Sequence, residues 1–96
     1  MLFMNTWQVH PDKRHEVYKV FSEMPAGDDV GDGGANIKLI GRWHDLTAGT
    51  GVAIYECDDP QAMALWALNW NESLDVDVVP VVNDEGAKAI GKLKWG

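Results

Sequence analysis

The order of apolar runs and helical patterns along the chain constrains its fold most. Four runs are rich in aromatic and branched side chains and have the length of β-strands: residues 1–9, 37–44, 51–57 and 74–82. A short glycine-containing segment, 45–50, separates the second run from the third and predicts a hairpin. Pro80 places the last strand at a sheet edge or at a bulge.

Helical patterns separate and follow these runs. Between Pro11 and Pro25, apolar residues recur at helical spacing, which predicts a first helix. Asp59 and Pro60 mark the start of a second helix, because aspartate caps a helix N-terminus and proline suits its first turn. A last helix starts near Asn83, and we expect its apolar residues to face the body of the protein: Ala87, Ile90 and Leu93.

The element order is therefore β-α-β-β-α-β followed by a C-terminal helix. With right-handed crossovers, this order gives a four-stranded antiparallel sheet with helices on one face, an α+β fold of the ferredoxin-like type. Ninety-six residues are enough for one domain only, so we assign residues 1–96 to a single unit.

The predicted strands lack the alternation of a sheet with one wet face. Residues 52–55 and 78–82 are almost continuously apolar, and the chain carries five tryptophans. Both sheet faces should then be covered, one by the helices and the other by a second sheet. Because most soluble oligomers are symmetric homo-oligomers, we expect a homodimer whose two sheets pack face to face as a dimeric α/β barrel.

The charge pattern excludes some partners. The formal net charge is −7, and no Lys or Arg lies between Trp43 and Ala87. Nucleic acids and anionic membranes both require cations, so neither is expected as a partner. Cys57 is the sole cysteine, which excludes an intrachain disulfide, and the first residues lack the basic region of a signal peptide. We therefore expect a cytoplasmic protein.

Several of these segments also carry a family resemblance: residues 41–43 (GRW), residues 54–60 (IYECDDP), the tryptophans Trp66 and Trp70, and residues 79–81 (VPV). Over about residues 1–85 the chain resembles a family of uncharacterised small bacterial and phage proteins, a domain of unknown function. That family is similar to the dimeric α/β-barrel superfamily. The superfamily includes cofactor-independent monooxygenases, haem-degrading enzymes, muconolactone isomerase-like enzymes and proteins without known activity, so the resemblance implies the fold rather than a reaction.

Two residues are candidates for proton transfer. The resemblance implies a functional use of the position of Glu56, and a carboxylate facing a dry barrel would have a raised pKa and could act as a general base. His44 could move a proton at neutral pH. Alternatively, Glu56 lies solvated at its strand end, and His44 lies at a wet edge.

Five further residues are candidates for ligand binding: Asn5, Trp7, Arg42, Trp43 and Trp66. Asn5 and Trp7 share one face of the first strand, whereas Arg42 and His44 share the face opposite to Trp43. The sequence leaves open which face of that strand lines a cleft. Core packing is the alternative role for Trp66, and structural pairing is the alternative for Asn5.

The sequence offers little for a metal or a cofactor, and we expect neither. His10 and His15 are badly spaced for a shared metal, and the aspartates of residues 28–32 do not follow the calcium-loop pattern. A haem-degrading enzyme would need an axial histidine, and no histidine follows His44. The Gly- and Asp-rich loop 25–36 could instead serve as a lid.

The leading hypothesis is a protein of unknown function that binds a small apolar or aromatic molecule in a barrel cleft, with isomerase-like or cofactor-free oxygenase-like chemistry as its enzymatic form. The alternative is a non-catalytic homodimeric binding or assembly protein. An enzyme should have a cavity in which polar groups converge, and an assembly protein should have a filled interior and an exposed apolar patch.

Overall fold

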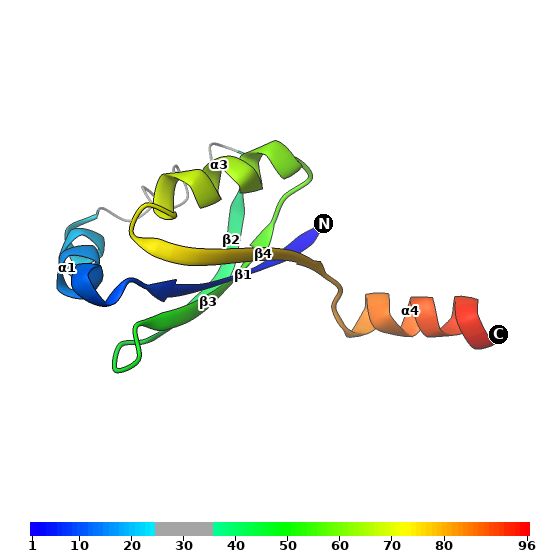
Figure 1. Ribbon diagram of the computed structural model, residues 1–96. Coiled ribbons are helices and arrows are strands. Elements are labelled where there is room, and N and C mark those ends of the chain that lie inside the picture. Colours follow the sequence, from blue (N-terminus) through cyan, green and yellow to red (C-terminus); the bar gives the residue numbers. More distant parts are fainter. Residues whose placement is uncertain (25–35) are drawn as a thin grey trace.

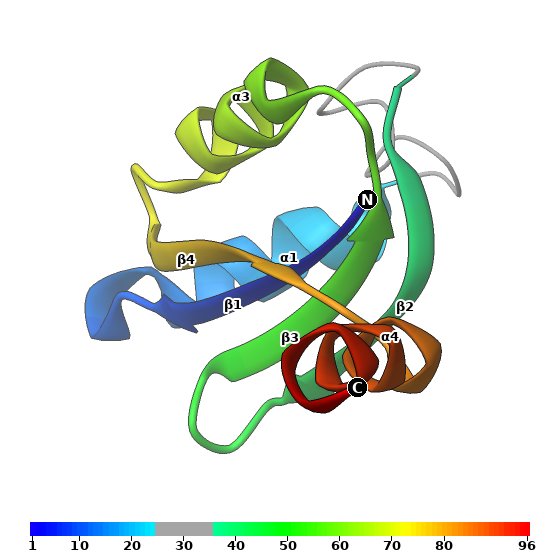
Figure 2. The same cartoon turned by 90° about the vertical axis from the view of Figure 1, so that its right-hand side faces the viewer.

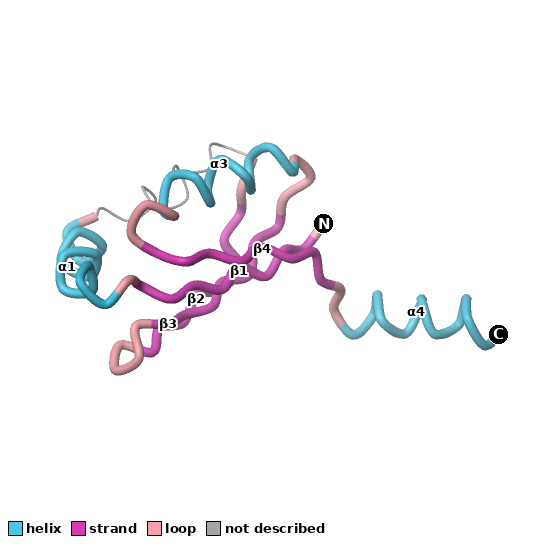
Figure 3. The backbone as a smooth tube through the Cα atoms, viewed as in Figure 1, coloured by secondary structure: helices cyan, strands magenta, loops and turns pink. Residues whose placement is uncertain are grey.

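The computed structural model describes residues 1–24 and 36–96, and the predicted element order is confirmed there. The strands are β1 (Leu2–Val9), β2 (Lys38–Asp45), β3 (Thr50–Glu56) and β4 (Leu74–Val81). The helices are η1 (Pro11–Lys13), α1 (Arg14–Glu23), α3 (Pro60–Trp70) and α4 (Asp84–Trp95). All strand neighbours are antiparallel, in the order β2-β3-β1-β4. This is the expected ferredoxin-like arrangement. Figure 3 shows the strands in magenta and the helices in cyan.

The helices lie on the sheet in different ways. Helix α3 lies across one face, and α1 lies near the end at which β1 finishes (Figure 1). Both contribute side chains to that face, which we call the helix-side face; the opposite one is the outer face. Helix α4 extends beyond the end of β4, away from the sheet (Figures 1 and 2).

The residues of β1 alternate between a buried face and a partly exposed face. Phe3, Asn5, Trp7 and Val9 are buried on the helix-side face, whereas the residues between them are at least partly exposed. This alternation follows from the two-residue period of a strand. Directly opposite residues share a face, so the strand pairing places Ala53 and Val78 beside Asn5 on the helix-side face.

Local signals fix the ends of several elements as predicted. The Asp59 carboxylate accepts a hydrogen bond from the Gln61 backbone N–H at 3.0 Å and so caps α3. Gly49 has a positive φ of 74° in the β2–β3 turn, a conformation that favours glycine. Pro80 lies in β4, which is an edge strand.

Helix α3 packs on the core with only one of its sides. Ala62, Met63 and Trp66 are buried against the sheet, and the Trp66 ring lies 5.8 Å from the Tyr55 ring between centroids. Leu65 and Leu68 are exposed on the far side of this helix. The apolar character of α3 therefore exceeds what the described part of one chain covers.

Two further predictions concern the last helix and the loop 25–36. The prediction that the last helix faces the body is wrong, because Ile90 and Leu93 are exposed and α4 points away from the sheet (Figure 1). Its start is as predicted: the Asn83 side chain accepts a hydrogen bond from the Gly86 N–H at 2.8 Å. The proposed lid, loop 25–36, lies outside the described residues except for Asn36.

Candidate functional site

The imidazole of His44 lies within an aromatic cluster on the helix-side face. Its ring centroid is 5.7 Å from that of Trp7, 6.5 Å from that of Tyr18 and 5.0 Å from that of Phe21. Trp7 comes from β1, and the other two rings come from α1. Tertiary packing thus surrounds a polar ring of β2 with aromatic neighbours from two other elements.

A β-bulge determines that His44 faces this way. The β2–β3 pairing shifts between Leu39 and Gly41, so Ile40 is an extra residue in β2. An extra residue reverses which side chains face inward beyond it. Leu39 lies opposite the buried Tyr55, and after the bulge Arg42 and His44, not Trp43, lie on the same helix-side face.

The surroundings of His44 favour its neutral form. Burial lowers the pKa of His44 below its ordinary value of 6.5, and the positive charge of Arg42 lowers it further. A neutral imidazole has an unprotonated nitrogen that can accept a proton or a hydrogen bond. Arg42 lies 5.2 Å from the centroid of the Phe21 ring, a cation–π contact that holds the guanidinium beside the cluster.

These residues enclose a small apolar cavity between α1, α3 and the sheet. Its walls are Trp7, Val9, Val17, Tyr18, Phe21, Arg42, His44, Trp66, Trp70 and Leu74. Its volume is about 40 Å³. Since one water molecule needs at least about 10–15 Å³, this space holds one to three waters as it stands.

Two cavity-lining residues carry buried polar atoms without a hydrogen-bond partner in the described part of the chain: the Tyr18 hydroxyl and the Trp66 indole Nε1. Burial raises the pKa of Tyr18, so its hydroxyl remains a neutral donor. A buried polar group left unpaired costs about 1–3 kcal/mol, and native structures rarely leave one without a function or a ligand.

Asn5 lies deeper in the same face, below α3. It is fully buried, and its Nδ2 lies 4.0 Å from the Met63 sulfur, a weak acceptor. Its Oδ1 is buried and also lacks a partner within the described ranges. Asn5 therefore adds a third unpaired polar atom to this face, although it does not line the cavity itself.

The structure brings together four of the seven sequence candidates, namely Trp7, Arg42, His44 and Trp66, and places two others elsewhere. Trp43 is 61% exposed on the outer face. Glu56 faces outward because it stands between Tyr55 and Cys57, which are both buried.

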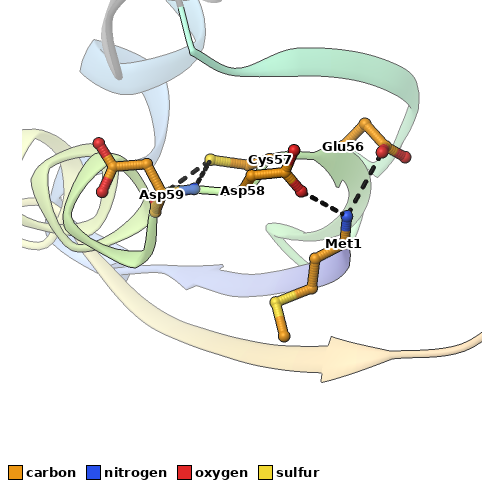
Figure 4. A network of polar contacts seen from close by, with 5 residues as sticks. All are labelled: Met1, Glu56, Cys57, Asp58 and Asp59. Atoms are coloured by element: carbon orange, nitrogen blue, oxygen red, sulfur yellow. Dashed lines mark hydrogen bonds and ion pairs between the residues drawn. The ribbon is translucent and has the colours of Figure 1, made fainter.

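Glu56 takes part in a separate polar network at its strand end (Figure 4). Its carboxylate lies 3.3 Å from the amino group of Met1, and that of Asp58 lies 3.0 Å from the same group. The two carboxylates raise the pKa of the Met1 amino group, chiefly through the hydrogen bond to Asp58. Glu56 is exposed and has no access to the cavity around His44.

The same network includes Cys57, which is buried. Its sulfur lies 3.3 Å from the Asp59 N–H and 3.2 Å from the Asp59 carbonyl oxygen (Figure 4). It therefore supports the turn into α3, a packing role.

Sequence reasoning missed the contribution of α1. Val17, Tyr18 and Phe21 line the cavity, and Val17 and Phe21 belong to the apolar stripe by which this helix was predicted. The apolar stripe of this helix could have indicated the contribution. A helix that follows the first strand covers the same sheet face, and Tyr18 lies three residues before Phe21 in that helix, so their side chains are neighbours.

In residues 1–24 and 36–96, no group of three His, Cys, Asp or Glu side chains is placed to hold a metal ion. No helix in these ranges is long and apolar enough to cross a membrane.

Comparison with known proteins places the chain in a family. The sequence model of a family described as a domain of unknown function (DUF3303) matches residues 1–94. No curated protein matches the chain.

Two solved structures are similar in fold. A crystal structure of an antibiotic biosynthesis monooxygenase has 17% sequence identity and a TM-score of 0.53, and the match covers 86% of this chain and 100% of that one. An uncharacterized NIPSNAP domain protein from Burkholderia xenovorans has 18% identity and a TM-score of 0.49, with 88% and 97% covered. At such identity the first likeness supports the fold alone.

Proposed function

We propose that this chain, which belongs to the DUF3303 family of unknown function, binds a small, flat, largely aromatic molecule in the cavity around His44. One observation carries the proposal: Tyr18 and Trp66 line the cavity, and the Tyr18 hydroxyl and the Trp66 Nε1 are buried without a partner in the described residues. Both are donors, so the expected ligand carries an acceptor oxygen or nitrogen on an apolar ring.

The ligand needs more room than the present cavity offers, because ligand sites usually have about 300–1,000 Å³. Helix α1 is the wall that we expect to move. It reaches the cavity through the side chains of Val17, Tyr18 and Phe21, whereas the other walls belong to the paired sheet and to α3, which is buried against it. Binding would therefore displace α1 outward and keep the sheet unchanged.

We further propose that His44 accepts a proton from the bound molecule. Its lowered pKa keeps the imidazole neutral, and Arg42 on the same strand face stabilises negative charge that develops on the ligand. Proton removal of this kind suits an isomerisation or a cofactor-free oxygenation. The structural neighbour described as a monooxygenase has a similar fold, but His44 and Arg42 carry the argument for chemistry.

The outer face supports the homodimer that we propose. Apolar side chains from three strands form a patch there that is only partly buried in one chain: Leu2, Met4, Ile54, Val79 and Val81. Trp43 and Ile40 of β2 add exposed apolar surface beside it. A second sheet would cover this patch, which is larger than a wet sheet face needs. We place the dimer in the cytoplasm.

A titration with 2-naphthol, followed by NMR of the five tryptophan indole N–H groups, tests the cavity. We expect the signals of Trp7, Trp66 and Trp70, which line the cavity, to shift. Those of Trp43 and Trp95 lie elsewhere and serve as internal controls. Tyr18→Phe should weaken binding with little change in fold, because it removes the donor and keeps the ring. Equal shifts at all five groups would contradict the proposal.

A non-catalytic assembly protein is the second candidate, and the small present cavity favours it. In that case no aromatic probe shifts the Trp66 signal, and the protein still forms a dimer. Native mass spectrometry of freshly purified protein separates the two functions. A dimer carrying a discrete extra mass supports ligand binding. A dimer without extra mass, in which no aromatic probe shifts the Trp66 signal, supports assembly.

A further inference from the structure

Helix α4 stands apart from the body of the protein. It leaves the end of β4 and extends away from the sheet (Figures 1 and 2). The radius of gyration is 15.1 Å, whereas a compact chain of this length has about 12.5 Å. The projecting helix accounts for this excess.

This helix is poorly suited to stand alone. It has 12 residues, and helices shorter than about 12–15 residues are marginal in water even in alanine-rich sequences. Gly86 and Gly91 weaken it further, by about 1 kcal/mol each relative to alanine. Leu93 is 88% exposed and Trp95 is 83% exposed. Such a helix needs a surface to pack on.

The outer face offers a surface of the right kind. A hollow of about 740 Å³ lies at the end of the sheet where β1 finishes and β4 begins. Among its lining residues are Thr6, Trp43 and Val52 on the outer face. Asp75 and Asp77 of the edge strand β4 border it on one side, and Asp45 of the opposite edge strand β2 borders it on the other.

The charges of the helix and of the hollow are opposite. Lys88, Lys92 and Lys94 are three of the eight cationic residues of the chain. The whole stretch from His44 to Ala87, which includes most of the hollow, contains no Lys or Arg. Long lysine side chains can lay their stems on apolar surface while their ammonium groups reach carboxylates at the rim.

We propose that α4 docks in the acidic hollow of a second copy of this chain, so that each protomer of the dimer gives one helix and receives one. The inference rests on the proposed homodimer. Ile90 and Leu93 would pack on the floor of the hollow, and the lysines would lie near Asp75 and Asp77. The helix starts three residues after Val81, at the sheet end opposite to its own hollow, and points away from it. A partner's hollow therefore suits it better.

A charge exchange tests this docking. One variant reverses the helix (Lys88→Glu, Lys92→Glu, Lys94→Glu), and the other reverses the hollow (Asp75→Lys, Asp77→Lys). Asp45 stays unchanged, because it caps the β2–β3 turn through Thr47 and Ala48. Each variant alone sets like charges against each other, so we expect its dimerisation, measured by analytical ultracentrifugation, to weaken at least tenfold.

Mixing the two variants provides the decisive result. In a mixed pair, both exchanged helices meet a hollow of opposite charge, so the heterodimer should form with nearly wild-type affinity. A chain with all five changes should dimerise as the wild type does. If the five changes restore dimerisation and mixing does not, the helix docks on its own chain and the proposal is wrong.

The remaining outcomes are also distinguishable. Variants that dimerise as strongly as the wild type would overturn the exchanged helix and leave the sheet-to-sheet dimer intact. A monomeric wild type would overturn both. Reversed charges near the helix C-terminus also weaken the helix through its dipole. The mixture controls for this, because rescue requires that the altered helix still docks.

Discussion

The two faces of the sheet come from the same four strands and both carry aromatic and polar side chains, yet they differ in burial. On the helix-side face, Trp7 is 8% exposed and shares a cavity with His44; on the outer face, Trp43 is 61% exposed. Asn5 is buried on the first face, and the carboxylates of Asp75 and Asp77 lie on the second. One face is closed within a chain, and we expect the other to close between chains.

Strand parity decides which of the two faces each side chain joins. Neighbouring residues of a strand face opposite environments, so a single residue step separates a cavity wall from the surface that we propose for dimerisation. Changes on the helix-side face should act within one chain at any protein concentration. Changes on the outer face should act through association, and their effects should depend on concentration.

Replacing the two tryptophans one at a time should give the largest difference. Trp7→Ala removes a buried indole, and we expect a loss of about 3–5 kcal/mol in the free energy of unfolding. Trp43→Ala removes an exposed ring and should cost each chain little, while weakening the dimer. Urea unfolding at two protein concentrations measures both effects. If the loss of unfolding free energy in Trp7→Ala depended on protein concentration, the helix-side face would also act through association.

Two glycines allow a second comparison of the faces: Gly51 lies beside Trp7, and Gly41 lies beside Trp43. A Cβ at Gly51 would clash with the Trp7 ring and lie 2.9 Å from the Trp43 carbonyl oxygen; one at Gly41 would lie 2.5 Å from the Trp43 ring. The Trp7 ring is confined by the core, so Gly51→Ala should cost about 1–3 kcal/mol.

The outer-face glycine is the control. The exposed Trp43 ring can swing away, so Gly41→Ala should change the free energy of unfolding by less than about 0.5 kcal/mol. The same urea experiment measures this substitution beside Gly51→Ala. Equal losses at the two positions would show that the outer face is as tightly packed as the core.

The pH dependence of stability should report on the helix-side face alone. Burial and Arg42 lower the pKa of His44 in the folded chain, whereas the unfolded imidazole takes up a proton near pH 6.5. Between these two pKa values the unfolded state binds more protons. Stability is therefore full above pH 6.5 and falls as the pH drops toward the folded-state pKa.

The control for this prediction is His44→Gln, which cannot titrate. Its unfolding free energy, measured by urea titration from pH 8 to pH 5, should fall less than that of the wild type over the same range. Parallel curves for the two proteins would mean that His44 is as solvated in the folded chain as in the unfolded one.

The sequence predicted the element order, both capped helix starts and the inward face of β1, because these depend on local signals and strand parity. It could not decide which face of β2 lines the cavity. The inward Leu39 alone would suggest that Trp43 also faces inward, and the bulge at Ile40 reverses this. A bulge arises from pairing with β3, so it is a tertiary feature. The position of α4 escaped prediction for the same reason, since an amphipathic pattern does not say whose surface it covers.

The smallest expected effect comes from Glu56→Gln. Parity places this carboxylate on the outer face, and its ion pair with the Met1 amino group is exposed, so its loss should change stability little. Binding of 2-naphthol should stay within twofold of the wild type, whereas His44→Gln, which removes the proton-accepting imidazole, should weaken binding more strongly. NMR shifts of the Trp66 indole N–H measure both. If Glu56→Gln weakened binding as much as His44→Gln, ligands would bind on the outer face, and the assignment of the two faces would have to be exchanged.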